Sequence, residues 1–140
     1  MDPPDSKTII NPPTLAAPRG FNHGIVTTGG RLLFLAGQTA LDQVGHIVAP
    51  GDVVAQYEQV LRNLQAVVEA AGGAMPDIVQ TTIFVRDLAG YQAQLGALGR
   101  VHRAYFGAYY PATALVEIGR LYDAAALIEV MGLAVIGERV

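Results

Sequence analysis

The chain has 140 residues, of which 51% are hydrophobic and only 15% are charged. This composition excludes a disordered chain, which needs low hydrophobicity and high net charge, and the length predicts one domain over residues 1–140. The net charge of −3 and the lack of any basic run argue against a nucleic-acid partner. A chain without cysteine has no disulfide framework and no thiolate chemistry. A small protein this rich in hydrophobic residues is expected to bury part of its apolar surface against other copies of itself.

The N-terminal segment has the composition of a tail followed by a loop. Residues 1–6 are expected to be disordered, and the polar, proline-rich start MDPPDSKTIINPP is unlike a signal peptide. No stretch reaches 18 apolar residues, so no transmembrane helix and no membrane partner are expected. These features favour a cytoplasmic protein.

The first part of the chain predicts short strands. Gly29 and Gly30 form a two-residue turn signal between two apolar runs, which predicts a hairpin over residues 24–36. The predicted strands are residues 7–10, 24–28, 31–36 and, shorter, 45–48.

The clearest helix is predicted over residues 52–71, where apolar residues recur at steps of three and four. Asp52 can accept hydrogen bonds from the first-turn amides, and Gly72 suits the left-handed exit. The later elements are a strand at 77–86, a second helix at 88–106 weakened by three glycines, and strands at 112–118 and 126–136. The order predicts an α+β fold, with a mixed β-sheet and two helices on one face.

The last predicted strand contains an isolated carboxylate, Glu129, in the apolar run AALIEVMGLAVI. Period-two alternation places it on one face with Leu127, Met131, Leu133 and Val135. Burying an ion there costs several kcal/mol, so the side chain pairs with an arginine, stays protonated or opens into a cleft. The last two arrangements build a general acid or base, and the first is purely structural.

Other chemistry-bearing residues give weaker signals. Glu117 repeats the pattern one strand earlier, where Arg120 is its expected structural partner. The three histidines, at 23, 46 and 102, show no metal-ligand spacing, so no metal site is predicted. His23 and His102 are expected to face solvent, and the alternative for His23 is a place in the wall of a pocket. Ser6 is the only serine, and no phosphate-binding or dinucleotide motif occurs, so no cofactor is expected.

Five segments stand out along the chain: FNHG, FLAGQ, DIVQTTIFVRDL, YPATALVEIGRL and LIEVMGLAV. In this order and spacing they resemble the Rid proteins, also called the YjgF or reactive-intermediate-deaminase family, over residues 7–136. The resemblance implies a chorismate-mutase-like fold and a homotrimer with ligand clefts between subunits. It also implies hydrolysis of reactive imines and enamines, which releases ammonia and a 2-keto acid.

The resemblance also assigns site residues. The glutamate that positions or activates water matches Glu129, and the glycine of the pocket wall matches Gly37. The pocket tyrosine matches Phe21, which keeps the ring and loses the hydroxyl. Ala114 stands where the family has serine, and the backbone of Leu115 borders the ligand.

One position departs from the family pattern. The arginine that grips the substrate carboxylate matches Thr113, whose hydroxyl offers one neutral hydrogen bond in place of a bidentate, charge-assisted grip. Weak or no activity on small 2-imino acids is therefore expected. Arg19, His23 or Arg103 is a candidate substitute cation.

The favoured function is that of an imine or enamine hydrolase, a deaminase in which Glu129 acts as the general base that activates water. Its substrate would rely less on a carboxylate group for binding. The alternative is a non-catalytic trimer that binds a small molecule, motivated by the missing arginine. Endoribonuclease action, which the older family name endoribonuclease L-PSP suggests, is disfavoured by the acidic charge balance and dispersed arginines. A chaperone-like or structural role is the remaining possibility.

Overall fold

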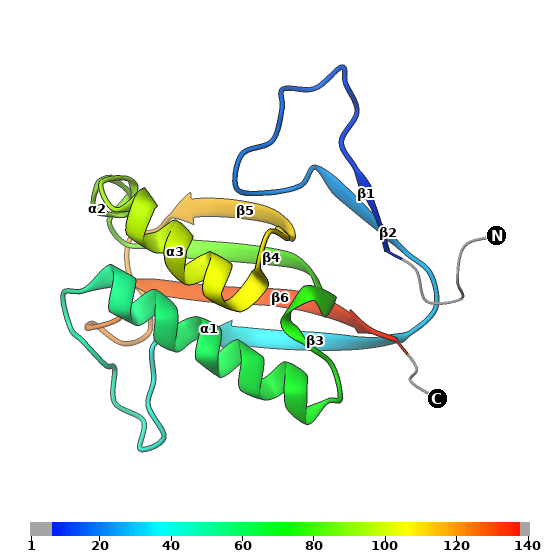
Figure 1. Ribbon diagram of the computed structural model, residues 1–140. Helices are drawn as coiled ribbons and strands as arrows, with labels where there is room; N and C mark the ends of the chain where they lie inside the picture. Colours follow the sequence, from blue (N-terminus) through cyan, green and yellow to red (C-terminus); the bar gives the residue numbers. More distant parts are fainter. Residues whose placement is uncertain (1–6, 138–140) are drawn as a thin grey trace.

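The structure, a computed structural model, describes residues 7–137; the tail expected at residues 1–6 lies outside the described part. A four-stranded mixed sheet carries two main helices on one face (Figure 1). The strand order is β3-β6-β4-β5, in which only β4 and β5 are parallel. The strands of this sheet are β3 (Arg31–Gln38), β4 (Ile78–Val85), β5 (Ala112–Glu117) and β6 (Ile128–Ile136), and the main helices are α1 (Val53–Ala70) and α3 (Leu95–Phe106).

Helix α1 follows the prediction closely. The Asp52 side chain accepts a hydrogen bond from the Ala55 amide at 3.0 Å, which caps the first turn. Gly72, just beyond the helix, has φ of 88°, the left-handed conformation that glycine adopts without strain. The apolar stripe packs on the sheet and forms the centre of the core, with Val60, Leu61, Leu64 and Val68 fully buried.

The hairpin predicted over residues 24–36 is wrong. Strand β2 (Gly24–Thr27) pairs instead with β1 (Lys7–Ile10), and β3 pairs with β6. The chain bends at Gly29 and Gly30, whose φ values are 74° and 81°, and the two strands enter different sheets. Gly30 packs on the end of β6, where an added Cβ would lie 2.8 Å from the Ile136 carbonyl oxygen. Tertiary packing on the long apolar β6 therefore overrides the local turn signal.

Two further elements differ from the prediction. Residues 45–48 form only an isolated bridge, Leu41 with Ile47, because the Asp42 carboxylate accepts the amides of Val44 and His46 and holds a loop. The helix predicted over 88–106 is divided into α2 (Leu88–Gln92) and α3. Glycine is unfavourable inside a helix by about 1 kcal/mol, and Gly90 and Gly96 flank the break.

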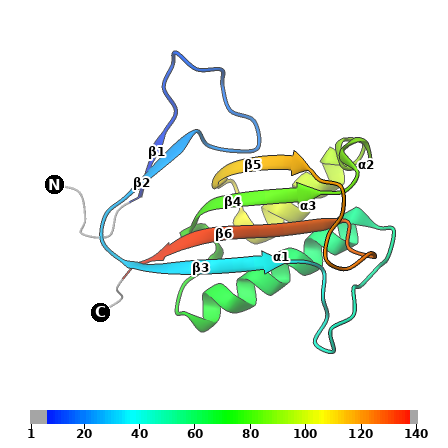
Figure 2. The ribbon, with the colours of Figure 1, turned by 180° about the vertical axis from the view of Figure 1, so that it is seen from behind.

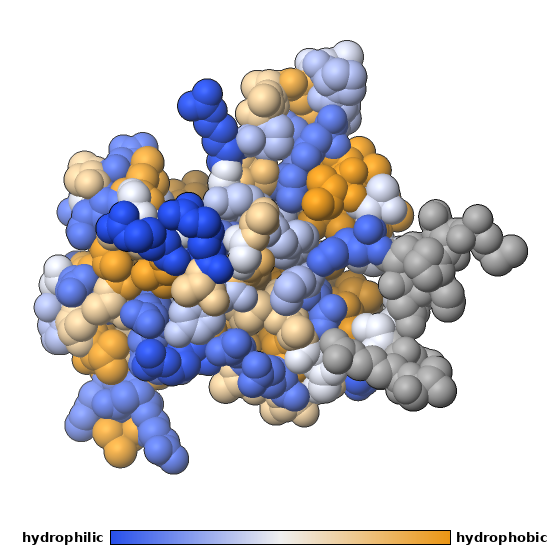
Figure 3. All heavy atoms as spheres, in the orientation of Figure 1, coloured by the Kyte–Doolittle hydropathy of each residue, from blue (hydrophilic) through white to orange (hydrophobic). Residues whose placement is uncertain are grey.

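The opposite face of the sheet is uncovered and apolar. Along β6 the buried residues alternate with Glu129, Met131 and Val135, which confirms the period-two reading. Figure 2 shows this face without a helix over it, whereas Figure 3 shows hydrophilic side chains gathered over the helices on the other side. Phe34 is 77% exposed and Leu32 is 63% exposed on this open face. A large exposed apolar patch marks an interaction surface.

Within the described residues, no helix combines the length and the apolar character needed to cross a membrane.

Candidate functional site

Glu129 and Gly37 come together on the open face of the sheet. An added Cβ at Gly37 would lie 2.8 Å from the Glu129 carboxyl carbon Cδ and 3.0 Å from its Oε2. The pairing of β3 with β6 is irregular between Leu35 and Gln38, so Gly37 sits in a local distortion of the strand. The structure thus brings two of the expected site residues into contact, and glycine at 37 leaves the space that the carboxylate occupies.

The Glu129 carboxylate has no internal partner. It is half-buried, and it makes no hydrogen bond and no ion pair with any residue between 7 and 137. The one ion pair within that range joins Arg62 and Glu58 at 3.6 Å, on the exposed surface of α1. The structural ion pair considered from the sequence is therefore absent from the described part of the chain, and the carboxylate faces the open side of the sheet.

A second group of expected residues gathers at the free edge of β5. Phe21, Thr113 and Ala114 line a hollow of about 250 Å³, and His23 lines it as well. The His23 ring meets the Phe21 ring edge-on, with centroids 5.1 Å apart, and its Nε2 pairs with the Ala16 carbonyl oxygen at 2.8 Å. Of the three proposed substitute cations, His23 alone lines this hollow; Arg19 and Arg103 are exposed elsewhere.

The N-terminal loop is fastened to β5 by Asn22. Its amide nitrogen Nδ2 donates to the Tyr110 carbonyl at 2.7 Å, and its backbone N–H donates to the Pro111 carbonyl at 3.2 Å. Asn11 adds a side-chain hydrogen bond to Asn22 at 2.8 Å. These bonds hold Phe21 over the start of β5, which positions its ring.

The Thr113 hydroxyl is fully engaged inside the chain. It donates to the Pro111 carbonyl oxygen at 3.0 Å, so it accepts from the Thr81 hydroxyl, which lies 2.9 Å away. A threonine hydroxyl has one proton to donate, and here that proton is used. Leu115 has its side chain packed against the core, so only its backbone can face a ligand.

The two groups stay apart within one chain. Thr113 is opposite Thr81 on β4, whereas Glu129 is opposite Phe84 on the same strand. Thr81 and Phe84 are three residues apart, which corresponds to about 10 Å along β4. Thr81 also faces the helices, whereas Glu129 faces the open side. The two residues therefore do not line one hollow within a single chain.

Two arginines lie close to each other beside the last strands, and the sequence did not predict this grouping. Arg86 and Arg120 line another hollow, of about 420 Å³, together with the fully exposed Tyr122. Arg86 donates to the Ala124 carbonyl. The expected pair of Glu117 with Arg120 does not form, because Glu117 Oε2 accepts the Leu88 amide at 2.8 Å and satisfies the first turn of α2. The sequence did contain one indication of a charged group at this place, because in the segment VRDL Arg86 directly follows a buried strand.

The histidines lie on separate parts of the fold. His102 was expected at the surface and is instead a buried residue of α3, where its Nε2 pairs with the Tyr109 carbonyl oxygen at 2.9 Å. Among residues 7–137, no three side chains of histidine, aspartate or glutamate gather in a way that would hold a metal ion.

Comparison with known proteins gives consistent relatives. The sequence profile described as Endoribonuclease L-PSP matches residues 13–136. The RutC family protein PH0854 of Pyrococcus horikoshii is 35% identical over 92 residues, which are 66% of this chain and 70% of that protein. The crystal structure of YyfB from Yersinia pestis, a Rid-family protein of unknown function, has a TM-score of 0.83 at 32% identity and covers 93% of this chain and 98% of its own. The YjgF gene product of E. coli has a TM-score of 0.63 at 35% identity, over 82% of this chain and 87% of its own.

Proposed function

The chain belongs to the endoribonuclease L-PSP family, which includes the Rid and YjgF proteins, and on this basis we propose that it hydrolyses imines or enamines with water activated by Glu129. One observation carries the proposal. Glu129 is a half-buried carboxylate with no internal partner, set on an apolar sheet face where Gly37 leaves space beside it. A carboxylate in such surroundings is suited to accept a proton from water.

The reaction needs only water and a proton carrier. Glu129 takes a proton from water while the water oxygen bonds to the imine carbon and the C=N π electrons move to nitrogen. The proton then passes from the carboxyl group to that nitrogen, which leaves a neutral carbinolamine. The carbinolamine hydroxyl then gives up its proton, which Glu129 passes to the nitrogen, so that the C=O bond forms as the C–N bond breaks and ammonia leaves. One water is consumed for each ammonia released. No cofactor is required in this sequence of steps.

The site assembles between subunits of a homotrimer in this proposal. The Glu129 and Gly37 group of one chain faces the Phe21, Thr113 and Ala114 group of its neighbour. Two features support this assembly: the groups are separated within one chain, and the open face around Glu129 exposes large apolar side chains that an adjoining subunit would cover.

The substrate differs from a small 2-imino acid. Thr113 brings no charge, and its hydroxyl proton is already donated to Pro111, so it offers no grip on a carboxylate. Phe21 presents a ring without a hydroxyl. A larger, more apolar imine that depends little on a carboxylate fits this hollow better.

The test is a panel of imines generated in the assay by an amine or amino-acid oxidase, with ammonia or carbonyl release followed against a trapping nucleophile. We expect faster release from an uncharged aryl imine than from 2-iminopropanoate. Glu129→Gln should lower the rate by about 100-fold or more, in the range typical for a lost general base. Rates with the parent no higher than the uncatalysed rates over the whole panel would disprove the hydrolase, and equal catalysed rates for the parent and Glu129→Gln would disprove the role of Glu129.

A second candidate, a trimer that binds a small molecule without turnover, is favoured by the engaged Thr113 hydroxyl. It predicts that a ligand raises the melting temperature while no substrate in the panel is consumed.

A further inference from the structure

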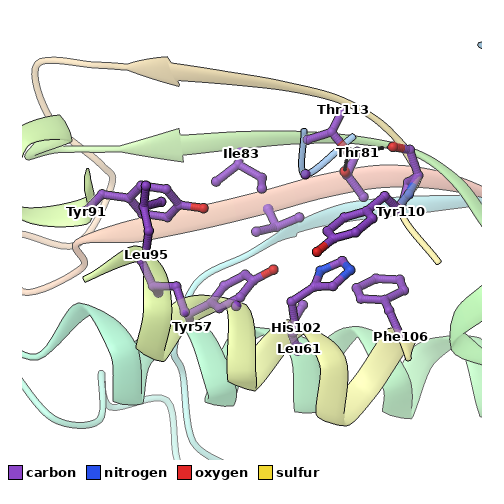
Figure 4. Close-up of a pocket in the computed structure, with 15 residues that line it drawn as sticks. Tyr57, Leu61, Thr81, Ile83, Tyr91, Leu95, His102, Phe106, Tyr110 and Thr113 are labelled. Atoms are coloured by element: carbon purple, nitrogen blue, oxygen red, sulfur yellow. Dashed lines mark hydrogen bonds between the residues drawn. The ribbon is translucent and has the colours of Figure 1, made fainter. Parts of the chain in front are cut away.

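A second cavity lies between the helices and the sheet, on the face opposite to Glu129, and Thr81 and Thr113 line both this cavity and the hollow at β5. Its volume is about 180 Å³, and no charged side chain lines it. Leu61 and Leu98 line it from the helices, and Ile83 and Val130 line it from the sheet. Figure 4 shows these walls, with tyrosine side chains reaching into the space between them.

Three tyrosines from different elements meet at this cavity. Tyr57 comes from α1, Tyr91 from α2 and Tyr110 from the segment before β5, and Figure 4 shows their hydroxyl ends turned toward the same space. Because the chain breaks between α2 and α3, Tyr91 does not belong to helix α3. Burial raises the pKa of Tyr57, and the neighbouring Tyr91 and Tyr110 raise it further. Burial also raises the pKa of Tyr91, so both groups remain neutral hydroxyls.

These hydroxyls have no partner among the described residues. Tyr57 is only 4% exposed, yet none of residues 7–137 hydrogen-bonds to its hydroxyl, nor to those of Tyr91 and Tyr110. The adjacent Tyr109 shows the usual arrangement, because its hydroxyl donates to the Ile78 carbonyl at 2.7 Å. No buried side-chain oxygen or nitrogen among the described residues lacks a hydrogen-bond partner, so these three hydroxyls border the open space of the cavity. A hydroxyl both donates and accepts, so a ligand in the cavity that carries hydrogen-bonding atoms can pair with them.

One wall is a stack of rings. His102 lies between Phe106, at 4.7 Å and 20°, and Tyr110, at 4.2 Å and 10°. Because a carbonyl oxygen only accepts, the bond from Nε2 to Tyr109 requires the proton on that nitrogen. Burial lowers the pKa of His102 and favours its neutral form. The wall is thus flat, aromatic and uncharged.

We propose that this cavity binds an uncharged, single-ring aromatic compound that bears a hydroxyl or a similar hydrogen-bonding group. A cavity of roughly 150 Å³ lined by apolar side chains holds benzene, so this one has room for a ring with one substituent. Apolar walls with a few converging polar groups are typical of small-molecule sites. An anion is disfavoured because no cation lines the space. Leu95, which is exposed, stands at its edge and gives access.

The experiment uses the full chain and three probes of similar size: phenol, benzene and benzoate. Titration followed by amide chemical shifts in NMR should show saturable phenol binding with a Kd of about 1 mM or below. Benzene should bind more weakly because it lacks the hydroxyl, and benzoate should not bind in the cavity. Failure of phenol to saturate, or tighter binding of benzoate at these residues, would overturn the proposal.

Two variants localise the binding. Tyr57→Phe removes one hydroxyl and should weaken phenol binding by about 2- to 10-fold while leaving benzene binding unchanged. Tyr122→Phe makes the same chemical change at a fully exposed residue and should have no effect. Equal phenol affinity in Tyr57→Phe and Tyr122→Phe would contradict the assigned role of the hydroxyl.

Two more variants test whether phenol binds in this cavity and whether its binding depends on Glu129. Ile83→Phe enlarges a side chain in the cavity wall and should abolish phenol binding in a protein that still melts cooperatively. Glu129→Gln should leave the phenol affinity unchanged, whether or not the proposed hydrolysis exists. Undiminished phenol binding to a folded Ile83→Phe variant would place the ligand elsewhere and refute the proposal.

Discussion

Gly37 and Glu129 approach each other so closely that an added Cβ at residue 37 would lie 2.8 Å from the carboxyl carbon of the glutamate. The carboxylate occupies the volume that any other residue would fill. Residue 37 must therefore be glycine because of one specific neighbour, Glu129. This contact joins the irregular end of β3 to the proposed general base on β6.

Gly37→Ala is expected to displace the Glu129 carboxylate and to lower kcat/KM for imine hydrolysis by about 10- to 100-fold, since a misplacement of about 1 Å has effects of this size. The rate of ammonia release and the melting temperature should be measured together. Gly119→Ala is the matched control, because an added Cβ there meets nothing within 4 Å. Equal losses in the two variants would show that Gly37 has no particular relation to the carboxylate.

Thr113→Arg is expected to create activity on 2-iminopropanoate, or to raise it by about 10-fold or more, because a guanidinium contributes charge-assisted bonds of about 1.5–3 kcal/mol. It also removes the hydrogen bond to Thr81, so the melting temperature should fall slightly. Thr113→Lys supplies the charge without the planar fork and should gain less. Unchanged hydrolysis of 2-iminopropanoate in both variants would show that this position does not face the substrate.

Phe34→Lys is expected to convert the proposed trimer to smaller species. The side chain is 77% exposed on the apolar open face, where a charge would oppose burial against another subunit. Light scattering after gel filtration measures the mass, and hydrolysis should decline with the loss of the trimer. Val44→Lys places the same charge on an equally exposed loop residue and should leave the mass unchanged. A monomeric mass for the parent chain would exclude the shared site.

Acidification is expected to destabilise the fold through His102. Burial lowers its pKa in the folded protein below the ordinary value of 6.5, so the unfolded chain binds the proton more readily. The contribution of His102 is therefore complete above about pH 7 and is lost as pH falls through the unfolded-state pKa toward the folded one.

Melting temperatures of the parent and of His102→Gln, measured from about pH 8 to about pH 5, should differ in slope, with the variant less sensitive to pH. Gln43, an exposed loop residue without a titratable group, provides the control variant Gln43→Ala, which should keep the parent's slope. Parallel profiles for the parent and His102→Gln would show that His102 does not contribute to the pH dependence.

The sequence predicted those elements whose signals are local. The cap at Asp52 and the 3.6-residue period define α1, and alternation around Glu129 defines β6. Alternation separates two faces of a strand but does not say which of them the helices cover. The open position of Glu129 therefore emerged only from the fold.

The missed features depend on residues far apart in the chain. The partner of Thr113 is Thr81, 32 positions earlier, so the engaged hydroxyl has no local signature. The hairpin failed because β6, about 100 residues downstream, outcompetes β2 as the partner of β3. The cavity gathers Tyr57, Tyr91 and Tyr110 from three separate segments, and no periodicity connects them.

The central position of β6 has a consequence for biosynthesis. This strand follows β3, β4 and β5 in the chain, yet it joins β3 to β4, which do not pair with each other. A nascent chain that ends before Ile128 therefore has two apolar strands with unfilled edges, and such edges favour aggregation. The four strands of the main sheet can pair fully only after residues 128–136 have been synthesised. A chaperone that shields β3 and β4 until then would raise the yield of native protein.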